Sequence, residues 1–423
     1  MNHEPYLAYE FGVAILAPWQ QACLASLRTI SALSAPLPAA MRNACAAWEL
    51  LAALQVSGER PPFRLSGGDT REEVVCSLPF CSLVRFRRGA GGPPVMLVAP
   101  LSGHYASRLR DTVGGLLDGH DVYVTDWHNA RDVPLGQGGF DLDDYIDYLL
   151  HFLRRIGPGA HLVAICQAST ASLAATALLA EDDDDVRPLS FTLMCGPVDP
   201  RISPTAIGRF AAGTPVTWFE RCMTTVVPPG FAGVGRRVAP GFLQVPSFSR
   251  NESTERFSAL LQSCAGLGVW DRAQIEQARH GYLDELSLLD LSGEFYLSTI
   301  RQVFQEAALA RGRLYWRGRR VRPEAIRDCA LMTIEAAEDD VCGPGQTHVA
   351  HELCSGLPPA LRRRLTQPRT GHVALFNGRT WQDDVCPAVR AMIAERGGDP
   401  KRPPQDGEAS RPPARPLLQT APL

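Results

Sequence analysis

The stretch His161-Leu-Val-Ala-Ile-Cys-Gln-Ala-Ser-Thr-Ala-Ser-Leu-Ala-Ala175 decides how the rest of the sequence is interpreted. A short run that is apolar on both faces leads through Cys166 into small residues and an alanine- and leucine-rich helix. At such a sharp strand-to-helix turn the flanking residues must be small, because the two backbones pass closely, and Ala164 and Ala168 meet that requirement. The pattern predicts that Cys166 is a nucleophile presented at the end of a central strand. The alternative is a buried structural cysteine.

Four further apolar runs resemble the run that precedes Cys166. They end in turn-forming residues and are separated by helical patterns, as in a buried parallel sheet. These runs are 95–100, 122–126, 191–194 and 330–334. We therefore predict an α/β fold of the α/β-hydrolase type, in which helices flank a mostly parallel sheet and a helical cap is inserted over the site. The predicted divisions are an N-terminal helical segment 1–57, a core 58–199 and 326–396, a cap 200–325 and a disordered Pro-rich tail 397–423.

Composition excludes several functional classes. The chain has 423 residues and a net charge of −3, so no basic field favours nucleic acid. Its single lysine, Lys401, leaves no P-loop or Schiff-base lysine. The start of the chain lacks the basic region of a secretory signal, and Pro18 interrupts its apolar run, so we predict a cytoplasmic protein without a membrane span. The other eleven of its 12 cysteines are interpreted as thiols in a reducing compartment.

An acid and a base follow Cys166 in the order that α/β hydrolases use. The last of the apolar runs leads into a carboxylate-rich loop that contains Asp339 and Asp340. Gly371 and His372 come later, on a loop where the general base belongs. The sequence thus predicts a Cys-Asp-His triad, with either aspartate as the acid.

The loop after the run 95–100 is predicted to complete the site. Backbone N–H groups of Leu101 and Ser102, together with that of Gln167, are the expected oxyanion hole. The residues expected around the substrate are Ser102, His104, Tyr105 and Trp127.

Several ordered motifs resemble one known family, the intracellular polyhydroxybutyrate depolymerases, over residues 5–392. They are Arg60-Pro-Pro-Phe63, Val98-Ala-Pro-Leu-Ser-Gly-His-Tyr-Ala106, Val124-Thr-Asp-Trp127, Ile165-Cys-Gln167, Gly196-Pro-Val-Asp199 with Ser203-Pro-Thr205, Asp339-Asp-Val341 with Gly345-Gln-Thr347, and Gly371-His372 with Phe376-Asn-Gly-Arg-Thr-Trp381. The resemblance implies a hydrolase that acts on amorphous polyester of 3-hydroxyalkanoates at storage granules. It also implies Asp339 as the acid, because a turn residue and then the aliphatic Val341 follow it.

Three neighbours of the triad differ from the family pattern, namely Ala168, Ala336-Ala337 and Val373. Two alternatives therefore stay open: a polyhydroxyalkanoate synthase-like acyltransferase and a catalytically impaired granule-surface protein. No metal or organic cofactor is expected, although coenzyme A could replace water as the acyl acceptor. A homo-oligomer is compatible with the sequence.

Overall fold

A computed structural model describes residues 60–63, 65, 70–89, 91–243 and 287–397, with residues 22, 25, 26 and 29. The predicted N-terminal helical segment, apart from these four positions, lies outside the described residues. So do residues 244–286 of the predicted cap and the predicted tail after residue 397.

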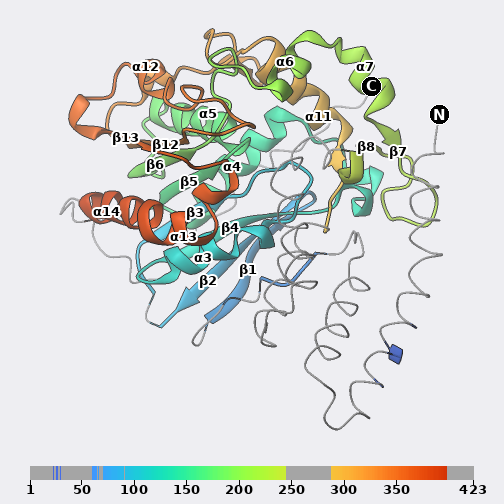
Figure 1. The fold of residues 1–423 in the computed structure, drawn as a ribbon, viewed down its shortest axis with the longest axis horizontal. Helices are drawn as coiled ribbons and strands as arrows, with labels where there is room; N and C mark the ends of the chain where they lie inside the picture. The colour runs from blue at the N-terminus through green and yellow to red at the C-terminus, as the bar shows by residue number, and fades with distance from the viewer. Residues whose placement is uncertain are drawn as a thin grey trace.

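An eight-stranded sheet forms the centre of the protein (Figure 1). Its strands lie in the order β1-β2-β4-β3-β5-β6-β12-β13. Strands β4 to β13 in this order are parallel, whereas β2 is antiparallel to both of its neighbours. The strands are β1 Thr70–Leu78, β2 Cys81–Arg88, β3 Pro94–Val98, β4 Asp121–Trp127, β5 His161–Ile165, β6 Ser190–Met194, β12 Ala330–Ala336 and β13 Arg362–Gln367. The five predicted apolar runs are all strands of this sheet, and the α/β-hydrolase fold is confirmed.

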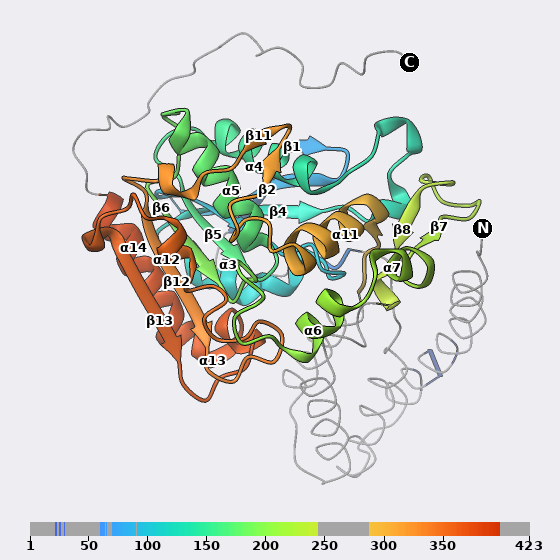
Figure 2. The same cartoon turned by 90° about the horizontal axis from the view of Figure 1, so that it is seen from above.

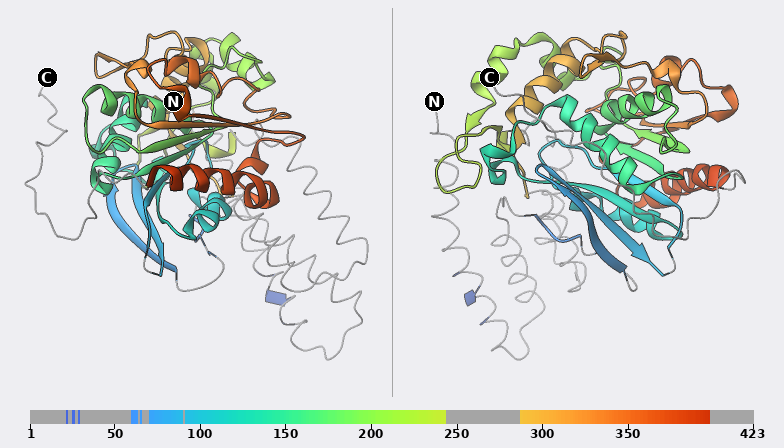
Figure 3. Two further views of the ribbon diagram at one scale, coloured as in Figure 1. Left: turned by 90° about the vertical axis from the view of Figure 1, so that its left-hand side faces the viewer. Right: turned by 180° about the vertical axis from the view of Figure 1, so that it is seen from behind.

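Helices cover both faces of the sheet (Figures 1 and 3). The helix α3, Arg110–Leu117, packs with α14, Cys386–Gly397, and α4, Leu142–Ile156, packs with α5, Ala168–Glu181. Two short helices, α12 at Ala350–Leu353 and α13 at Gly378–Thr380, complete this part. No helix in the described ranges is long and apolar enough to cross a membrane.

Local sequence explains where α4 begins and ends. The side chain of Asp141 accepts hydrogen bonds from the backbone N–H groups of Asp143 at 2.8 Å and Asp144 at 3.1 Å, which forms a capping box. Gly157 ends the helix with a φ of 93°, a conformation that residues with a side chain rarely adopt. These two signals fix the connection between β4 and β5.

The described residues between β6 and β12 lie at the carboxyl ends of the parallel strands (Figure 2). It contains helices α6 Ala206–Gly213, α7 Val216–Cys222 and α11 Gly293–Thr299, and strands β7 Thr225–Val226, β8 Arg237–Ala239, β9 Leu291–Ser292, β10 Tyr315–Trp316 and β11 Arg319–Arg320. Strands β7, β8 and β9 form a small antiparallel sheet, so the described part of the predicted helical cap also holds β-structure. Strands of two or three residues leave no periodic pattern in a sequence, and they were therefore not predicted.

Candidate active site

Cys166 lies on the sharp turn between β5 and α5. Its φ of 54° is unusual for a residue with a side chain, and strain of this kind is typical of a nucleophile elbow. The turn is crowded, since a Cβ added to Gly196 would lie 2.5 Å from the carbonyl oxygen of Cys166. Ala164 and Ala168 are fully buried on either side. The thiol of Cys166 itself is only partly buried, which a nucleophile requires.

Asp339 and His372 form a buried hydrogen-bonded pair at the same edge of the sheet. Nδ1 of His372 lies 2.7 Å from Oδ2 of Asp339. The other carboxylate oxygen accepts hydrogen bonds from the backbone N–H groups of Val341 at 2.9 Å and Cys342 at 2.8 Å. Asp340 is exposed, so the structure pairs His372 with the first of the two aspartates. With Nδ1–H donating to the carboxylate, Nε2 is left as the nitrogen that can accept a proton.

The surroundings of His372 favour its protonated form. Burial opposes the positive charge, but the interactions of the ring with Cys195, Cys166 and Asp339 outweigh it and hold the pKa of His372 well above its ordinary value. An imidazole with a raised pKa keeps a proton that it takes from a neighbouring thiol. The site therefore favours the imidazolium form of His372, which is the form that a general base takes after it has accepted a proton.

A second cysteine, Cys195, adjoins the same pair and was not predicted. It directly follows β6, is fully buried and has a φ of 43°. Its sulfur, a ring nitrogen of His372 and a carboxylate oxygen of Asp339 lie within 4.8 Å of one another. Burial raises the pKa of Cys195 to about 11, although the interaction with His372 lowers it. One signal could have found it: the apolar run 191–194 ends in a cysteine, as the run before Cys166 does.

Cys195, Asp339 and His372 also offer the ligand types that zinc binds. In this structure the carboxylate and the imidazole are hydrogen-bonded to each other. That is the geometry of an acid–base pair, and a metal ion at this position would have to displace the hydrogen bond.

The predicted oxyanion groups lie beside Cys166. The backbone N–H of Leu101 donates to the side-chain Oε1 of Gln167 at 3.4 Å. Gln167 is also the N-cap residue of α5, so its own N–H belongs to the helix terminus, where partial positive charge accumulates. A substrate oxygen could replace Oε1 of Gln167 as the acceptor of this long hydrogen bond from Leu101.

Two cavities meet at Cys166, and Ser102 lines both of them. The first has a volume of about 120 Å³ and is lined mainly by apolar side chains of the segment between β6 and β12. Among these are Ile207, Phe210, Phe219, Tyr296 and Phe304. The second has a volume of about 70 Å³ and lies at His372. Cys166 is thus reached from an apolar side and from a side that carries the candidate base.

The comparison with protein families gives a match in the C-terminal part of the chain. Residues 195–397 match the family described as PHB de-polymerase C-terminus. This segment is therefore similar to the PHB depolymerase family. It contains Asp339 and His372, whereas Cys166 precedes it. The resemblance noted from the sequence is confirmed for this segment, and the nucleophile stays a prediction.

Solved structures with a similar chain course were also found, but no curated protein matches the sequence. A monoacylglycerol lipase from Paleococcus ferrophilus has 15% identity and a TM-score of 0.43, with 74% of this chain and 99% of that chain covered. A bromoperoxidase from Bacillus anthracis has 11% identity, a TM-score of 0.41 and coverages of 77% and 100%. A meta-cleavage product hydrolase from Pseudomonas fluorescens has 16% identity, a TM-score of 0.41 and coverages of 78% and 98%.

The residues predicted around the substrate separate into two groups in this structure. Ser102, His104 and Tyr105 line the 70 Å³ cavity at His372. Trp127 lines neither cavity at Cys166, and its role in substrate binding stays a prediction. Its ring is 1% exposed and stacks on Tyr145 with centroids 4.5 Å apart, and its Nε1–H donates to the carbonyl oxygen of Ala99 at 2.9 Å. Through this hydrogen bond Trp127 supports the start of the loop that follows β3.

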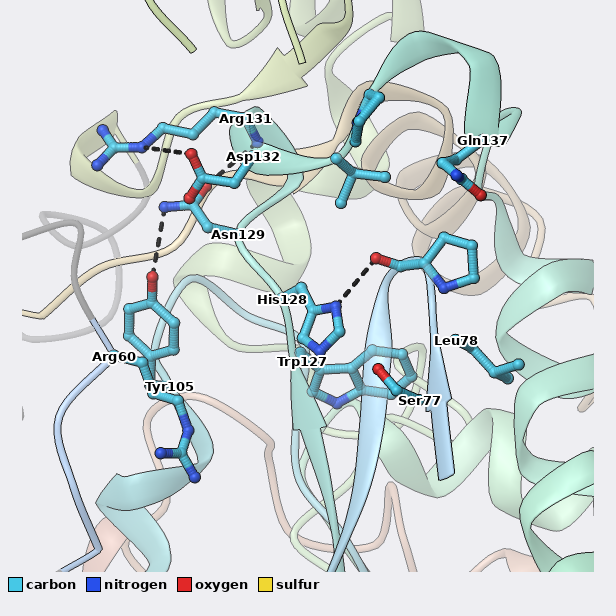
Figure 4. Close-up of a pocket in the computed structure, with 13 residues that line it drawn as sticks. Arg60, Ser77, Leu78, Tyr105, Trp127, His128, Asn129, Arg131, Asp132 and Gln137 are labelled. Atoms are coloured by element: carbon cyan, nitrogen blue, oxygen red, sulfur yellow. Dashed lines mark hydrogen bonds and ion pairs between the residues drawn. The ribbon is translucent and has the colours of Figure 1, made fainter. Parts of the chain in front are cut away.

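Tyr105 and Trp127 also line a larger hollow of about 840 Å³ (Figure 4). Polar groups surround it, including His128, whose Nδ1 lies 3.0 Å from the carbonyl oxygen of Pro79. Neither Cys166 nor His372 lines this hollow. The size of this hollow therefore says nothing about the chemistry at Cys166 and His372.

Proposed function

We propose that this protein hydrolyses the ester bonds of poly(3-hydroxybutyrate) or a related polyhydroxyalkanoate, with Cys166 as nucleophile, His372 as general base and Asp339 as the acid that orients the base. One observation carries the proposal: a cysteine on a strained elbow shares a cavity with a histidine whose Nδ1 lies 2.7 Å from a buried carboxylate. The family of residues 195–397 supports the polyester as substrate.

The reaction follows the order of covalent acyl transfer. His372 takes the proton of Cys166, and the thiolate attacks the carbonyl carbon of an ester. Backbone N–H groups of Gln167, Leu101 and Ser102 bind the oxyanion, and each strong donor contributes about 3 kcal/mol. The C–O bond of the ester then breaks, His372 gives its proton to the departing alkoxide oxygen, and a 3-hydroxyacyl thioester remains on Cys166.

Water completes the cycle. His372, now neutral, removes a proton from water, which attacks the thioester and releases 3-hydroxybutyrate or a short oligomer. Coenzyme A or another thiol in place of water would give a thioester product. The apolar cavity under Phe219 and Tyr296 suits the aliphatic acyl unit, because it offers few polar partners.

We further propose that residues 58–199 and 326–396 act as the catalytic core and 200–325 as a cap over it. On this proposal the cap supplies the apolar wall of the acyl cavity, and the protein acts at the surface of a polyester granule.

The decisive assay measures 3-hydroxybutyrate released from amorphous polymer granules. Cys166→Ala should abolish release, whereas Cys222→Ala, which removes an exposed thiol that lines neither cavity, should leave it unchanged. Selective labelling of Cys166 by iodoacetamide at neutral pH would show that its thiol is activated. A Cys166→Ala protein that still releases product would end the proposal. Polymer formed from 3-hydroxybutyryl-CoA would favour the synthase-like alternative instead.

A further inference from the structure

Cys166 and Cys195 are direct neighbours on adjacent parallel strands. Ile165 of β5 pairs with Met194 of β6, and each cysteine is the next residue of its strand. The pairing continues beyond the strands, since the backbone N–H of Cys166 donates to the carbonyl oxygen of Met194 at 2.8 Å. Neighbouring strands lie about 4.8 Å apart. This spacing falls within the range of roughly 4.4 to 6.8 Å between Cα atoms that a disulfide spans.

Both cysteines leave the strand conformation at the same point. Their φ values are 54° and 43°, so neither side chain follows the alternation of its strand. The sulfur of Cys195 lies within 4.8 Å of a nitrogen of His372, and Cys166 shares a cavity with the same ring. The interactions with both cysteines also raise the pKa of His372. The two thiols therefore converge on one imidazole.

The two thiols differ in access. Cys166 is partly exposed and lines two cavities, whereas Cys195 is 0% exposed. An oxidant that enters from solvent meets Cys166 first. Cys195 is reached only by a group that is already inside the site.

We propose that Cys166 and Cys195 form a reversible disulfide, in which a peroxide oxidises Cys166 and Cys195 resolves the product. In the first step the Cys166 thiolate attacks a peroxide oxygen: an S–O bond forms, the O–O bond breaks, and the departing hydroxide takes a proton and becomes water. In the second step Cys195, after giving its proton to His372, attacks the sulfenic sulfur. An S–S bond forms, the S–O bond breaks, and the hydroxide leaves as water with the proton of His372. The two thiols lose two electrons in total, and the peroxide is reduced to two molecules of water.

The disulfide would inactivate Cys166 and would also protect its sulfur from irreversible oxidation. A sulfenic acid without a partner thiol proceeds to sulfinic acid, which thiol reductants do not reverse, whereas a disulfide is reduced by them. Oxidation would thus switch the proposed ester hydrolysis off without destroying Cys166. The disulfide itself does not depend on the identity of the ester substrate.

Cys342 is the competing partner and provides the matched control. It is buried beside the same cavity as Cys166. Its sulfur, however, lies 3.5 Å from Oε1 of Gln346 and 3.9 Å from Oγ1 of Thr347, which hold it in the loop after β12. A Cys342→Ala variant therefore removes a buried thiol near the site without removing the proposed resolving group.

The experiment treats the full chain with hydrogen peroxide and maps disulfides by mass spectrometry of unreduced peptides. Wild type and Cys342→Ala should both yield the peptide that joins Cys166 to Cys195, and dithiothreitol should restore their free thiols and their ester hydrolysis. Cys195→Ala should yield no such peptide and should carry sulfinic acid at Cys166, with about tenfold less recovery.

Two outcomes would overturn the inference: a peptide that joins Cys166 to another cysteine in the wild type, or equal recovery of the wild type and Cys195→Ala. Cys195→Ser, which keeps a polar atom of nearly the same size, checks the result if the alanine variant folds poorly. The peptide map stays informative even if the protein hydrolyses no polyester, so a failure of the proposed function is recognised separately.

Discussion

Asp339 and Asp340 are adjacent carboxylates with different surroundings, and they offer a matched pair of substitutions. Asp339→Asn should lower kcat by about 10³- to 10⁴-fold, because an amide in this place no longer fixes the ring of His372 in the tautomer that accepts a proton at Nε2. Asp340→Asn should change kcat by no more than a few-fold, since its side chain is exposed. Steady-state hydrolysis of a soluble 3-hydroxybutyrate oligomer measures both. Similar losses in the two variants would contradict the assignment of the acid.

The residues that carry the proposed chemistry could be predicted because each follows a recognisable local pattern. Cys166 has small neighbours between a strand and a helix, and His372 follows a glycine on a late loop. The choice between Asp339 and Asp340 depends on which carboxylate is buried, and a sequence does not show that. Cys195 was not predicted as part of the site: the sequence shows a cysteine at the end of the run 191–194, but its proximity to His372 depends on which strand lies beside which.

His161 is buried where β5 pairs with β6, and we expect its burial to make the folded protein less stable in acid. Nδ1 of His161 lies 2.7 Å from Oγ of Ser190, and burial lowers the pKa of the ring from 6.5 to about 4. As the pH falls below 6.5, the His161 ring of the unfolded chain therefore binds a proton, whereas the ring in the folded protein does not. The free energy of unfolding should be unaffected by this group above pH 6.5 and should fall by about 3 kcal/mol as the pH drops to about 4.

His161→Asn tests this dependence, since an amide can keep the hydrogen bond to Ser190 but does not titrate. Urea unfolding at pH 7 and pH 4.5 should show a smaller loss for the variant than for the wild type. His128→Asn is a control on a half-buried histidine outside this strand pair. An identical pH dependence in the wild type and His161→Asn would show that other groups cause the acid unfolding.

Glu335, the penultimate residue of β12, organises the loop that follows the proposed acid. Its buried carboxylate accepts backbone hydrogen bonds from Gly345 at 2.7 Å, Thr347 at 2.7 Å and His348 at 2.8 Å. Glu335→Gln would place an NH₂ group against at least one of these donors and should lower the free energy of unfolding by about 3 kcal/mol. The exposed Glu338→Gln should have little effect. Thermal unfolding, with hydrogen exchange of the three amides, checks the result, and unchanged exchange would refute it.

The edges of the sheet show where sequence patterns fail to predict an element. The central strands are buried on both faces and were recognised as apolar runs. Among the described residues, the strand β13 has one neighbouring strand and faces solvent along much of its length, and it reads Arg-Arg-Arg-Leu-Thr-Gln. The strand β1, for which the described residues show pairing with β2 alone, is also largely exposed. Tertiary pairing, rather than side-chain periodicity, makes these segments strands.

At the scale of the whole molecule, one buried arginine joins the segment above the sheet to the core. Arg236, just before β8, is 3% exposed and lies over the ring of Phe80 at 4.9 Å. Its guanidinium donates to three carbonyl oxygens of the loop before α4, those of Val133 at 2.9 Å, Pro134 at 2.7 Å and Gly138 at 2.8 Å. A guanidinium suits this position because it offers several donors in a fixed plane and keeps its charge when buried.

Arg236→Met should loosen the proposed cap, because it keeps a side chain of similar length but leaves three carbonyl oxygens without their donor. We expect the free energy of unfolding to fall by about 4 kcal/mol and proteolytic cleavage near β8 to become faster than in the wild type. Arg237→Met, at the neighbouring and more exposed position, should behave like the wild type. Since the apolar cavity at Cys166 is walled by this segment, loosening it should also raise KM for the polyester oligomer more than it lowers kcat. Equal cleavage rates in the two methionine variants would show that contacts other than this arginine hold the segment over the site.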